Sequence, residues 1–308
     1  MKSLQNEIRH MLVEKNAVLL AHYYQRTEIQ EIADFLGDSL ELAKKAQKSD
    51  KDIIVFAGVK FMAETAKILN PDRMVLLPNL AAGCSLADSC PPNEFAIFKS
   101  QYPDHKVVSY VNTSAEIKAM SDYICTSSNA LKVIENIPKE TPIIFAPDRN
   151  LGNYLNKITN RNMILWDGIC IVHHSFSMEK IVNLKFANLD AKIIAHPESD
   201  PMILDIADFI GSTSKLLKFV IEDKAQKFII ATEVGILEKM RLLAPNKTLI
   251  PAPINENNTC ACSECAFMKT ITLENIYSAL KEEKHKIEID PQIAQKAIIP
   301  LENMINMN

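Results

Sequence analysis

The sequence predicts an α/β protein built from three related layers of parallel strands and helices that pack around one centre. Short apolar, β-branched runs alternate along the chain with amphipathic segments of helical period, a pattern typical of βαβ units. The strands, about nine to eleven in all, are more than one small sheet usually carries. Cysteines in turn-like segments also recur about every ninety residues. A single eight-stranded barrel is the alternative architecture for a chain of this length.

Nine apolar runs are short enough to be strands, and amphipathic segments separate most of them. No linker or low-complexity stretch divides the chain, so we expect the layers to pack tightly. Strands are predicted over 17–21, 52–57, 74–78, 106–111, 142–147, 162–166, 192–196, 227–232 and 247–253, and helices over 28–36, 62–69, 115–120, 129–137 and 214–222. The sequences YIC (123–125) and DFIG (208–211) mark two further strand ends.

Composition excludes several classes of protein. The chain has 308 residues, 47% of them hydrophobic, and a net charge of −4 with both signs interspersed, so a sizeable core is expected and nucleic acid is not an expected partner. No apolar run approaches the roughly 20 residues of a membrane helix, and the first residues lack the pattern of a secretory signal. We therefore expect a cytoplasmic protein without a membrane partner, whose seven cysteines are thiols, metal ligands or redox groups rather than disulfides.

Three cysteines are near-evenly spaced, since Cys84 and Cys170 are 86 residues apart (170 − 84) and Cys170 and Cys265 are 95 apart (265 − 170). Each has Gly, Asp, Ser or Pro within a few residues, which indicates a loop, where ligands tend to lie. One thiolate from each third of the chain predicts a shared metal centre with one position open, and soft thiolates favour zinc or an iron–sulfur cluster. Cys260, Cys262 and Cys265 form a C-x-C-x-x-C cluster that is ambiguous by itself. Two other cysteines, Cys90 and Cys125, are interpreted as ordinary thiols.

Polar residues follow nearly every predicted strand, and ligands of parallel sheets bind at the carboxyl ends of strands. His22, Tyr24, His196 and Glu198 have no evident capping duty and are the strongest candidates for chemistry. Some of the others are expected to be helix caps, among them Ser114 and Asp200. The segment GSTSK (211–215) either holds a small anion or only caps a helix through Ser212. His173 and His174 closely follow Cys170, so they either contact the site or have packing or surface roles.

A family resemblance adds to these observations. The motifs CSLADSCP, YVNTSAEIKA, CTSSNA, PDRNLG, WDGIC-x-VH, HPE, IGSTS, TE-x-GI and a final C-x-x-M, in order from AHYYQ at Ala21 to CAFM at Cys265, resemble those of the quinolinate synthase family. The resemblance implies an enzyme of NAD biosynthesis that condenses iminoaspartate with dihydroxyacetone phosphate to give quinolinate, phosphate and water. It also implies one 4Fe–4S cluster per chain, whose open iron acts as a Lewis acid, and a possible transient partner, L-aspartate oxidase or dehydrogenase, that supplies iminoaspartate.

The fold implied is a set of three pseudo-threefold-related αβα sandwich domains with parallel sheets around a central active site. Their expected bounds are 1–84, 85–170 and 171–265, with residues 266–308 packing on the first domain. The resemblance makes Cys84, Cys170 and Cys265 the cluster ligands, and Cys260 and Cys262 non-ligands. Some relatives space the upstream cysteines as C-x-x-C, proposed to be a redox switch, and the C-x-C here departs from that spacing. Ser199 replaces the cysteine of the family's HPEC, at a position that is not a ligand.

The resemblance and the strand-end positions together suggest roles for the site residues. Glu198 is the expected general base, with a pKa raised by partial burial, and Tyr24 is a partner acid or proton relay. His22 and His196 are expected to bind substrate carboxylates or move protons, and Tyr110 to take part in catalysis. The residues expected to bind substrate are His22, Ser39, Tyr110, Asn112, Ser127, His196, Glu198, Ser212 and Thr213. A zinc-dependent lyase or aldolase that uses the same thiolates, and a non-catalytic iron–sulfur sensor, are the rival hypotheses.

Overall fold

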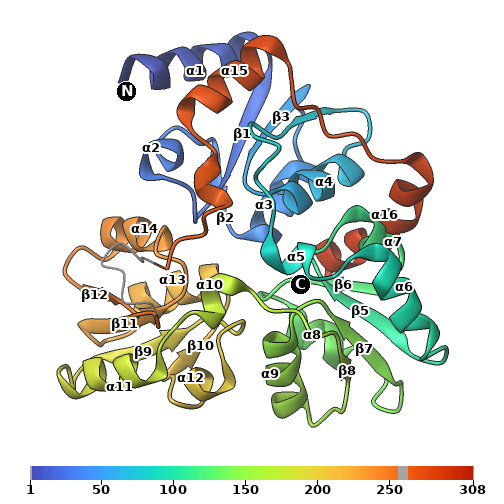
Figure 1. Cartoon of the computed structure of the whole chain (residues 1–308). Helices are drawn as coiled ribbons and strands as arrows, with labels where there is room; N and C mark the ends of the chain where they lie inside the picture. Colours follow the sequence, from blue (N-terminus) through green and yellow to red (C-terminus); the bar gives the residue numbers. More distant parts are fainter. Residues whose placement is uncertain (1, 256–262, 308) are drawn as a thin grey trace.

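Three four-stranded parallel sheets form the molecule, and the three-layered α/β architecture predicted from sequence is confirmed (Figure 1). The computed structural model describes residues 2–255 and 263–307. The three sheets lie in three lobes that meet at the middle of the molecule, and no eight-stranded barrel forms among the described residues. The same strand order recurs in each, because the first strand of every unit pairs with both the second and the third.

The first sheet has the order β2-β1-β3-β4. Its two central strands are buried throughout, and their runs AVLLA and IIVFA are the near-continuous apolar sequences typical of a sheet covered on both faces. The elements are α1 (Lys2–Glu14), β1 (Ala17–His22), α2 (Thr27–Gln30), β2 (Phe35–Gly37), α3 (Ser39–Gln47), β3 (Ile53–Ala57), α4 (Lys60–Leu69) and β4 (Met74–Leu76).

The second sheet has the equivalent order β6-β5-β7-β8. Ser114 caps α7 as predicted, since its hydroxyl accepts a hydrogen bond from the backbone N–H of Ile117. The elements are α5 (Ser85–Asp88), α6 (Pro92–Ser100), β5 (Lys106–Tyr110), α7 (Ala115–Ala119), β6 (Tyr123–Cys125), α8 (Ala130–Glu135), β7 (Ile143–Ala146), α9 (Arg149–Thr159) and β8 (Ile164–Leu165).

The third sheet has the order β10-β9-β11-β12. The prediction that Asp200 caps the next helix was wrong, because its carboxylate instead accepts from the His174 ring and the Asn150 amide. The elements are α10 (Ile171–His174), α11 (Met178–Phe186), β9 (Lys192–Ala195), α12 (Pro201–Asp205), β10 (Phe209–Ile210), α13 (Thr213–Glu222), β11 (Lys227–Ala231), α14 (Ile236–Leu243) and β12 (Thr248–Pro251).

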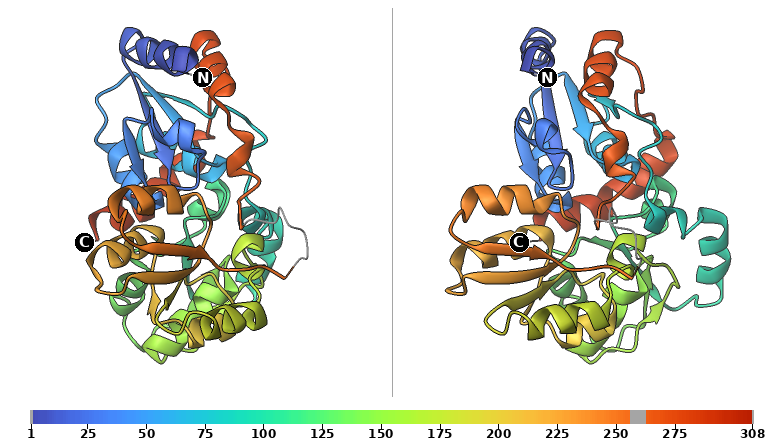
Figure 2. Two further views of the ribbon diagram at one scale, coloured as in Figure 1. Left: turned by 90° about the vertical axis from the view of Figure 1, so that its left-hand side faces the viewer. Right: turned by 60° about the vertical axis from the view of Figure 1, so that its left-hand side comes forward.

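The C-terminal segment returns across the molecule as η1 (Met268–Thr270), α15 (Leu273–Glu282) and α16 (Pro291–Asn306). Helix α15 lies beside α1 (Figure 1), whereas α16 packs on α4 of the first lobe and on α7 and β6 of the second. Figure 2 shows the red C-terminal segment running from the first lobe toward the middle of the molecule. The Asn129 side chain donates a hydrogen bond to the carbonyl of Met304, joining α16 to the second lobe. This segment therefore fastens two lobes together.

The helix predicted over 28–36 was wrong in its second half. Helix α2 ends at Gln30, and the chain from Phe35 forms the edge strand β2. Asp34 directs this change, since its N–H donates to the Leu19 carbonyl and its carboxylate accepts from the Leu19 N–H. These two bonds draw residues 34–37 onto β1, and tertiary pairing overrides the helical period of the sequence.

Lys118 in α7 is a fully buried cation. Its ammonium group donates to the Thr113 carbonyl and lies 5.5 Å from the centre of the Phe61 ring. Burial lowers the pKa of Lys118 from 10.5 to about 8, although nearby Glu64 opposes this change. Because the folded-state pKa lies below the unfolded value, burying the charge destabilises the fold below pH 8, and this cost disappears as the pH rises toward 10.5.

We therefore predict a pH-dependent stability difference for Lys118→Met. The free energy of unfolding of the variant minus that of the wild type should fall by about 2 kcal/mol between about pH 7.5 and 10, because only the wild type relieves a buried charge over that range. Urea unfolding at the two pH values measures this difference in free energy. All other titrating groups are common to both proteins, so their contributions cancel. The exposed lysine of α8 provides the control Lys132→Met, which should show a constant difference. A constant difference for Lys118→Met as well would contradict the prediction.

Within the described residues, no helix combines the length and the apolar character that crossing a bilayer requires.

Candidate active site

A cavity of about 770 Å³ of unfilled space is lined by residues of all three lobes. In each sheet the strand order reverses between the first and third strands, and the carboxyl ends of such strand pairs are where parallel sheets bind ligands. The cavity gathers the residues at these ends from all three lobes. Of the predicted site residues, those that line it are His22, Tyr24, Ser39, Cys84, Tyr110, Asn112, Ser127, Cys170, His196, Glu198, Thr213 and Cys265.

Ser212 is the predicted site residue that does not line the cavity. Its side chain is fully buried and accepts a hydrogen bond from the Lys215 N–H, so it caps α13. The capping interpretation of the GSTSK segment is thus confirmed for Ser212. Thr213, the next residue, faces the cavity from the first turn of this helix.

The three predicted cysteine ligands come from three different lobes or their connections. Cys84 precedes α5, Cys170 precedes α10 and Cys265 follows β12 along the chain, and all three are free and half-buried. Burial is the main cause that raises the pKa of each thiol, to about 12 for Cys84. Cys265 raises the pKa of Cys84 further, and Cys84 does the same to Cys170, so the three sulfurs share one electrostatic environment.

The loop that carries Cys170 is fixed by a close backbone approach. The Gly168 N–H donates to the Pro147 carbonyl at 3.1 Å, and its own carbonyl accepts from the Arg149 N–H at 2.9 Å. A Cβ atom on Gly168 would lie 2.4 Å from the Pro147 oxygen, so no other residue fits. The WDGIC sequence therefore needs its glycine to bring the cysteine to the cavity.

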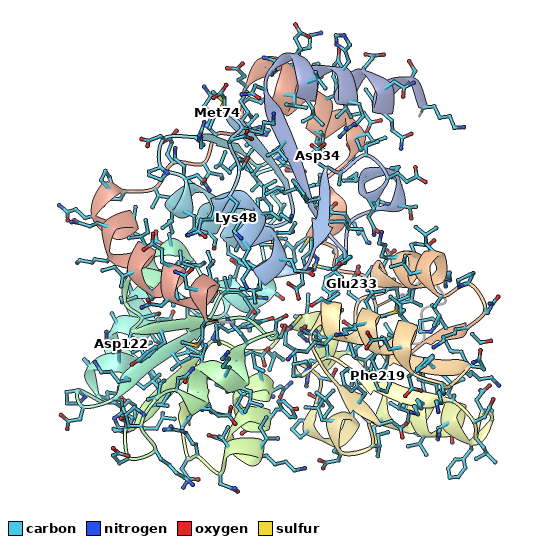
Figure 3. The ribbon with its side chains drawn as sticks, turned by 180° about the vertical axis from the view of Figure 1, so that it is seen from behind. Asp34, Lys48, Met74, Asp122, Phe219 and Glu233 are labelled. Atoms are coloured by element: carbon cyan, nitrogen blue, oxygen red, sulfur yellow. The ribbon has the colours of Figure 1, made fainter. Side chains whose placement is uncertain are left out.

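Glu233 fixes the loop that carries Cys265. One of its carboxylate oxygens accepts from the Cys265 N–H at 3.1 Å and the other from the Gly235 N–H at 2.7 Å. The Lys269 ammonium lies 3.2 Å from the same carboxylate and donates to the Tyr24 carbonyl at 2.7 Å. Burial, opposed by Lys269, raises the pKa of Glu233 to about 7. Figure 3 shows Glu233 between the first and third lobes, where it joins the Cys265 loop to the Tyr24 segment.

Glu198 is a buried carboxylate held from both sides. Tyr110 donates its hydroxyl to one oxygen, and Nδ1 of His173 lies 2.9 Å from the other. Burial opposes ionisation, but the interactions with His196 and His173 and the Tyr110 hydrogen bond outweigh it and hold the pKa of Glu198 below its usual range. The expectation of a raised pKa was therefore wrong, because the sequence did not reveal these three partners. The carboxylate is ionised at neutral pH and able to accept a proton.

The two histidines predicted for the site are neutral. Burial lowers the pKa of His22 to about 4 and that of His196 to about 3. Nδ1 of His22 accepts from the Tyr24 N–H at 3.1 Å, and Nδ1 of His196 accepts from the Glu198 N–H at 3.4 Å. Each ring therefore carries its proton on Nε2, which in His196 lies 3.2 Å from the Ser127 hydroxyl.

Tyr24 also keeps its proton. Burial is the main cause that raises its pKa well above 10, against the hydrogen bonds of its hydroxyl with Thr213 at 2.8 Å and Thr232 at 3.0 Å. Asn112 offers a different group, since its buried amide oxygen has no hydrogen-bond partner among the described residues. Tyr24, with its protonated phenol, and Asn112, with its unpaired amide oxygen, thus both line the cavity.

The cavity residues that were not predicted from the sequence include the carboxylates Asp38 and Glu233, and the role of His173 was left open. Asp38 accepts hydrogen bonds from the hydroxyls of Ser128 at 2.7 Å and Ser214 at 2.6 Å, so one carboxylate joins residues that follow β2, β6 and β10 of the three lobes. The incorrect helix over 28–36 concealed the strand before Asp38. Glu233 follows a strand that was predicted, so the strand-end rule applied to it as well.

The donor set fits an iron–sulfur cluster better than a single ion on the three thiols. Among the described residues, the one group of three donors within 4.8 Å of one another is Cys170, His173 and Glu198, and it does not include Cys84 or Cys265. A centre that contacts all three thiols must therefore be larger than one metal ion, which suits a cluster. This spacing disfavours the rival zinc enzyme that uses the same three thiolates. Cys260 and Cys262 lie outside the described residues.

Fold and cavity together define a class of protein: a three-lobed parallel α/β protein in which three separate cysteines meet a buried carboxylate. A family model described as Quinolinate synthetase A protein matches residues 6–306. The chain therefore belongs to the quinolinate synthetase A protein family, as the motifs predicted.

Several quinolinate synthases are similar in sequence to this chain over nearly their whole length. A quinolinate synthase of Trichormus variabilis is 59% identical over 295 residues, which are 96% of this chain and 90% of the relative. One of a Nostoc species is 58% identical over 301 residues, 98% of this chain and 92% of the relative. One of Thermosynechococcus vestitus is 53% identical over 301 residues, 98% of this chain and 94% of the relative.

Proposed function

We propose that this chain is a quinolinate synthase of de novo NAD biosynthesis, which condenses iminoaspartate with dihydroxyacetone phosphate to give quinolinate, phosphate and water. The observation that carries this proposal is the convergence of Cys84, Cys170 and Cys265 on a cavity that also holds the Glu198 carboxylate, in a chain similar over almost its full length to proteins named quinolinate synthase. Its thiols favour the reducing cytoplasm. L-aspartate oxidase or dehydrogenase is the proposed transient source of iminoaspartate.

Cys84, Cys170 and Cys265 are the proposed ligands of one 4Fe–4S cluster per chain. When bound, a cluster with one iron free of protein ligands supplies a Lewis acid that polarises a substrate oxygen or nitrogen. The protein supplies the remaining chemistry, because every bond change in forming a pyridine ring requires a proton to move.

Glu198 is the proposed general base, since its carboxylate is ionised, buried and aligned by Tyr110 and His173. Tyr110 and Tyr24 both keep their protons and serve as donors to substrate oxygen. The neutral rings of His22 and His196 each present an N–H to the cavity, which suits hydrogen bonding to a carboxylate or transfer of a proton.

Anionic groups of the substrates are proposed to bind at the helix starts. Ser39 and Thr213 open α3 and α13, which have nine and ten residues, and both line the cavity. At α13, backbone N–H groups and the helix dipole favour phosphate and carboxylate. At α3 the Leu40 and Glu41 N–H groups already donate to the Asp38 carboxylate, so Ser39 contributes its hydroxyl there. Ser127 and the unpaired amide oxygen of Asn112 add polar contacts, and Ser212 acts indirectly by capping α13.

The test is to purify the protein without oxygen and measure iron, acid-labile sulfide and quinolinate formation from the two substrates. We expect about four iron and four sulfide per chain together with quinolinate. Zinc without sulfide in active protein would overturn the cluster, and a loaded cluster without quinolinate would overturn the reaction.

A further inference from the structure

The half-buried Cys170 and the buried His173 and Glu198 have the arrangement of a single-metal site. Nδ1 of His173 lies 3.3 Å from the Cys170 sulfur and 2.9 Å from a Glu198 oxygen, and the three donor atoms all lie within 4.8 Å of one another. Ligand atoms about 2.0 to 2.3 Å from a tetrahedral zinc ion lie roughly 3.3 to 3.6 Å apart. Side-chain movements of about an ångström therefore complete a three-ligand site.

The groups around these donors also suit a metal. Nε2 of His173 lies 3.0 Å from the Thr232 hydroxyl, which leaves Nδ1 free for an ion and orients the ring. The Tyr110 hydroxyl holds the second oxygen of Glu198. One thiolate and one carboxylate neutralise a divalent ion, which removes the cost of placing an isolated charge beside His173 and Glu198, whose side chains are only 3% exposed. All three residues line the cavity, which has room for a water molecule as the fourth ligand.

We propose that the cluster-free protein binds one zinc or similar divalent transition-metal ion through Cys170, His173 and Glu198. The site uses one of the proposed cluster cysteines and leaves Cys84 and Cys265 uncoordinated. The ion and the cluster therefore exclude each other, and zinc at this site blocks loading of the cluster. Binding releases the thiol proton of Cys170 to solvent, with no change in oxidation state.

Cobalt(II) titration of reduced, chelator-treated protein under nitrogen tests the site, because the sulfur-to-cobalt charge-transfer band grows with the number of thiolates. We expect one cobalt per chain, a band for one thiolate, and displacement by zinc. Cys170→Ala should abolish the band. Glu198→Gln and His173→Ala should weaken binding more than tenfold. Thr232→Val, which removes the outer partner of His173 together with one partner of the Tyr24 hydroxyl, should weaken it about tenfold.

The matched controls are Cys84→Ser and Cys265→Ser, which should bind cobalt as the wild type does. A band for three thiolates, or loss of binding in either control, would place the ion among the three cysteines and overturn the proposal. Absence of stoichiometric cobalt binding would overturn it too. Circular dichroism of each variant separates loss of the site from loss of the fold.

A second measurement tests the exclusion of the cluster. Zinc added before iron and sulfide should suppress reconstitution of the wild type, and a chelator should restore it. His173→Ala should resist the suppression at the same zinc concentration, and equal suppression would contradict the shared site. Because these readouts use metal binding and cluster content, they are independent of whether the loaded protein forms quinolinate.

Discussion

Cys170→Ser should leave the protein folded but without the proposed cluster, and quinolinate formation should fall by at least about a thousandfold. The reason is that serine is a poor ligand for iron in a cluster held by thiolates, and loss of Lewis-acid stabilisation worth several kcal/mol costs a factor of ten for each 1.4 kcal/mol. Cys84→Ser and Cys265→Ser should behave in the same way. Iron and sulfide content, the visible spectrum and product formation measure the effect.

Two other buried cysteines provide the controls for this prediction. Cys90 packs in the second lobe and Cys125 ends β6, and neither lines the cavity. Cys90→Ser and Cys125→Ser should retain iron and activity. Equal loss in these controls, or a full iron content in Cys170→Ser, would contradict the ligand assignment. Loss on changing Cys260 or Cys262 would move the third ligand within the terminal cysteine cluster.

Glu198→Gln has the second largest expected effect, a fall in kcat of roughly 10²- to 10⁴-fold with the cluster spectrum intact. Glutamine preserves the size of the side chain and an oxygen that accepts from Tyr110, but it cannot accept a proton. A structural role alone would instead change cluster content or stability. Steady-state kinetics on protein with measured iron content makes the distinction, and normal turnover would contradict the assignment of Glu198 as base.

Tyr110→Phe distinguishes the effect of losing the base, Glu198, from the effect of losing the hydroxyl that aligns it. This variant keeps the carboxylate and removes one hydrogen bond from it. We expect a smaller loss than for Glu198→Gln, because the His173 contact still holds the other oxygen. A loss as large as that of Glu198→Gln would mean that Tyr110 transfers a proton itself.

The sequence predicted most of the fold because the central strands are buried on both faces and therefore appear as apolar runs. It failed at β2, an edge strand of three residues, where the bonds between Asp34 and Leu19 decide the outcome. No sequence pattern within residues 28–36 indicates that this segment pairs with a strand fifteen residues earlier. A short edge strand forms because it pairs with a neighbouring strand, and the periodicity of its own sequence does not report that pairing.

The candidate site was predictable to the extent that polar residues at strand ends face one cavity. That rule located His22, Tyr24, His196 and Glu198, and the family motifs added the cysteines. The ionisation of Glu198 was not predictable, because it depends on the distances of Tyr110 and His173, which lie 88 and 25 residues away in the sequence (198 − 110 and 198 − 173). Burial alone would raise the pKa of Glu198 and favour its protonated form.

The distribution of the three thiols over the chain has a consequence for folding. A centre that binds Cys84, Cys170 and Cys265 closes two loops of 86 and 95 residues, and cross-links over about 100 residues restrict the unfolded chain by roughly 4 to 5 kcal/mol each in the chain-entropy treatment. The centre would thus act as a reversible cross-link between the three lobes. Oxidative loss of the cluster would then abolish the reaction and also loosen the three lobes from one another.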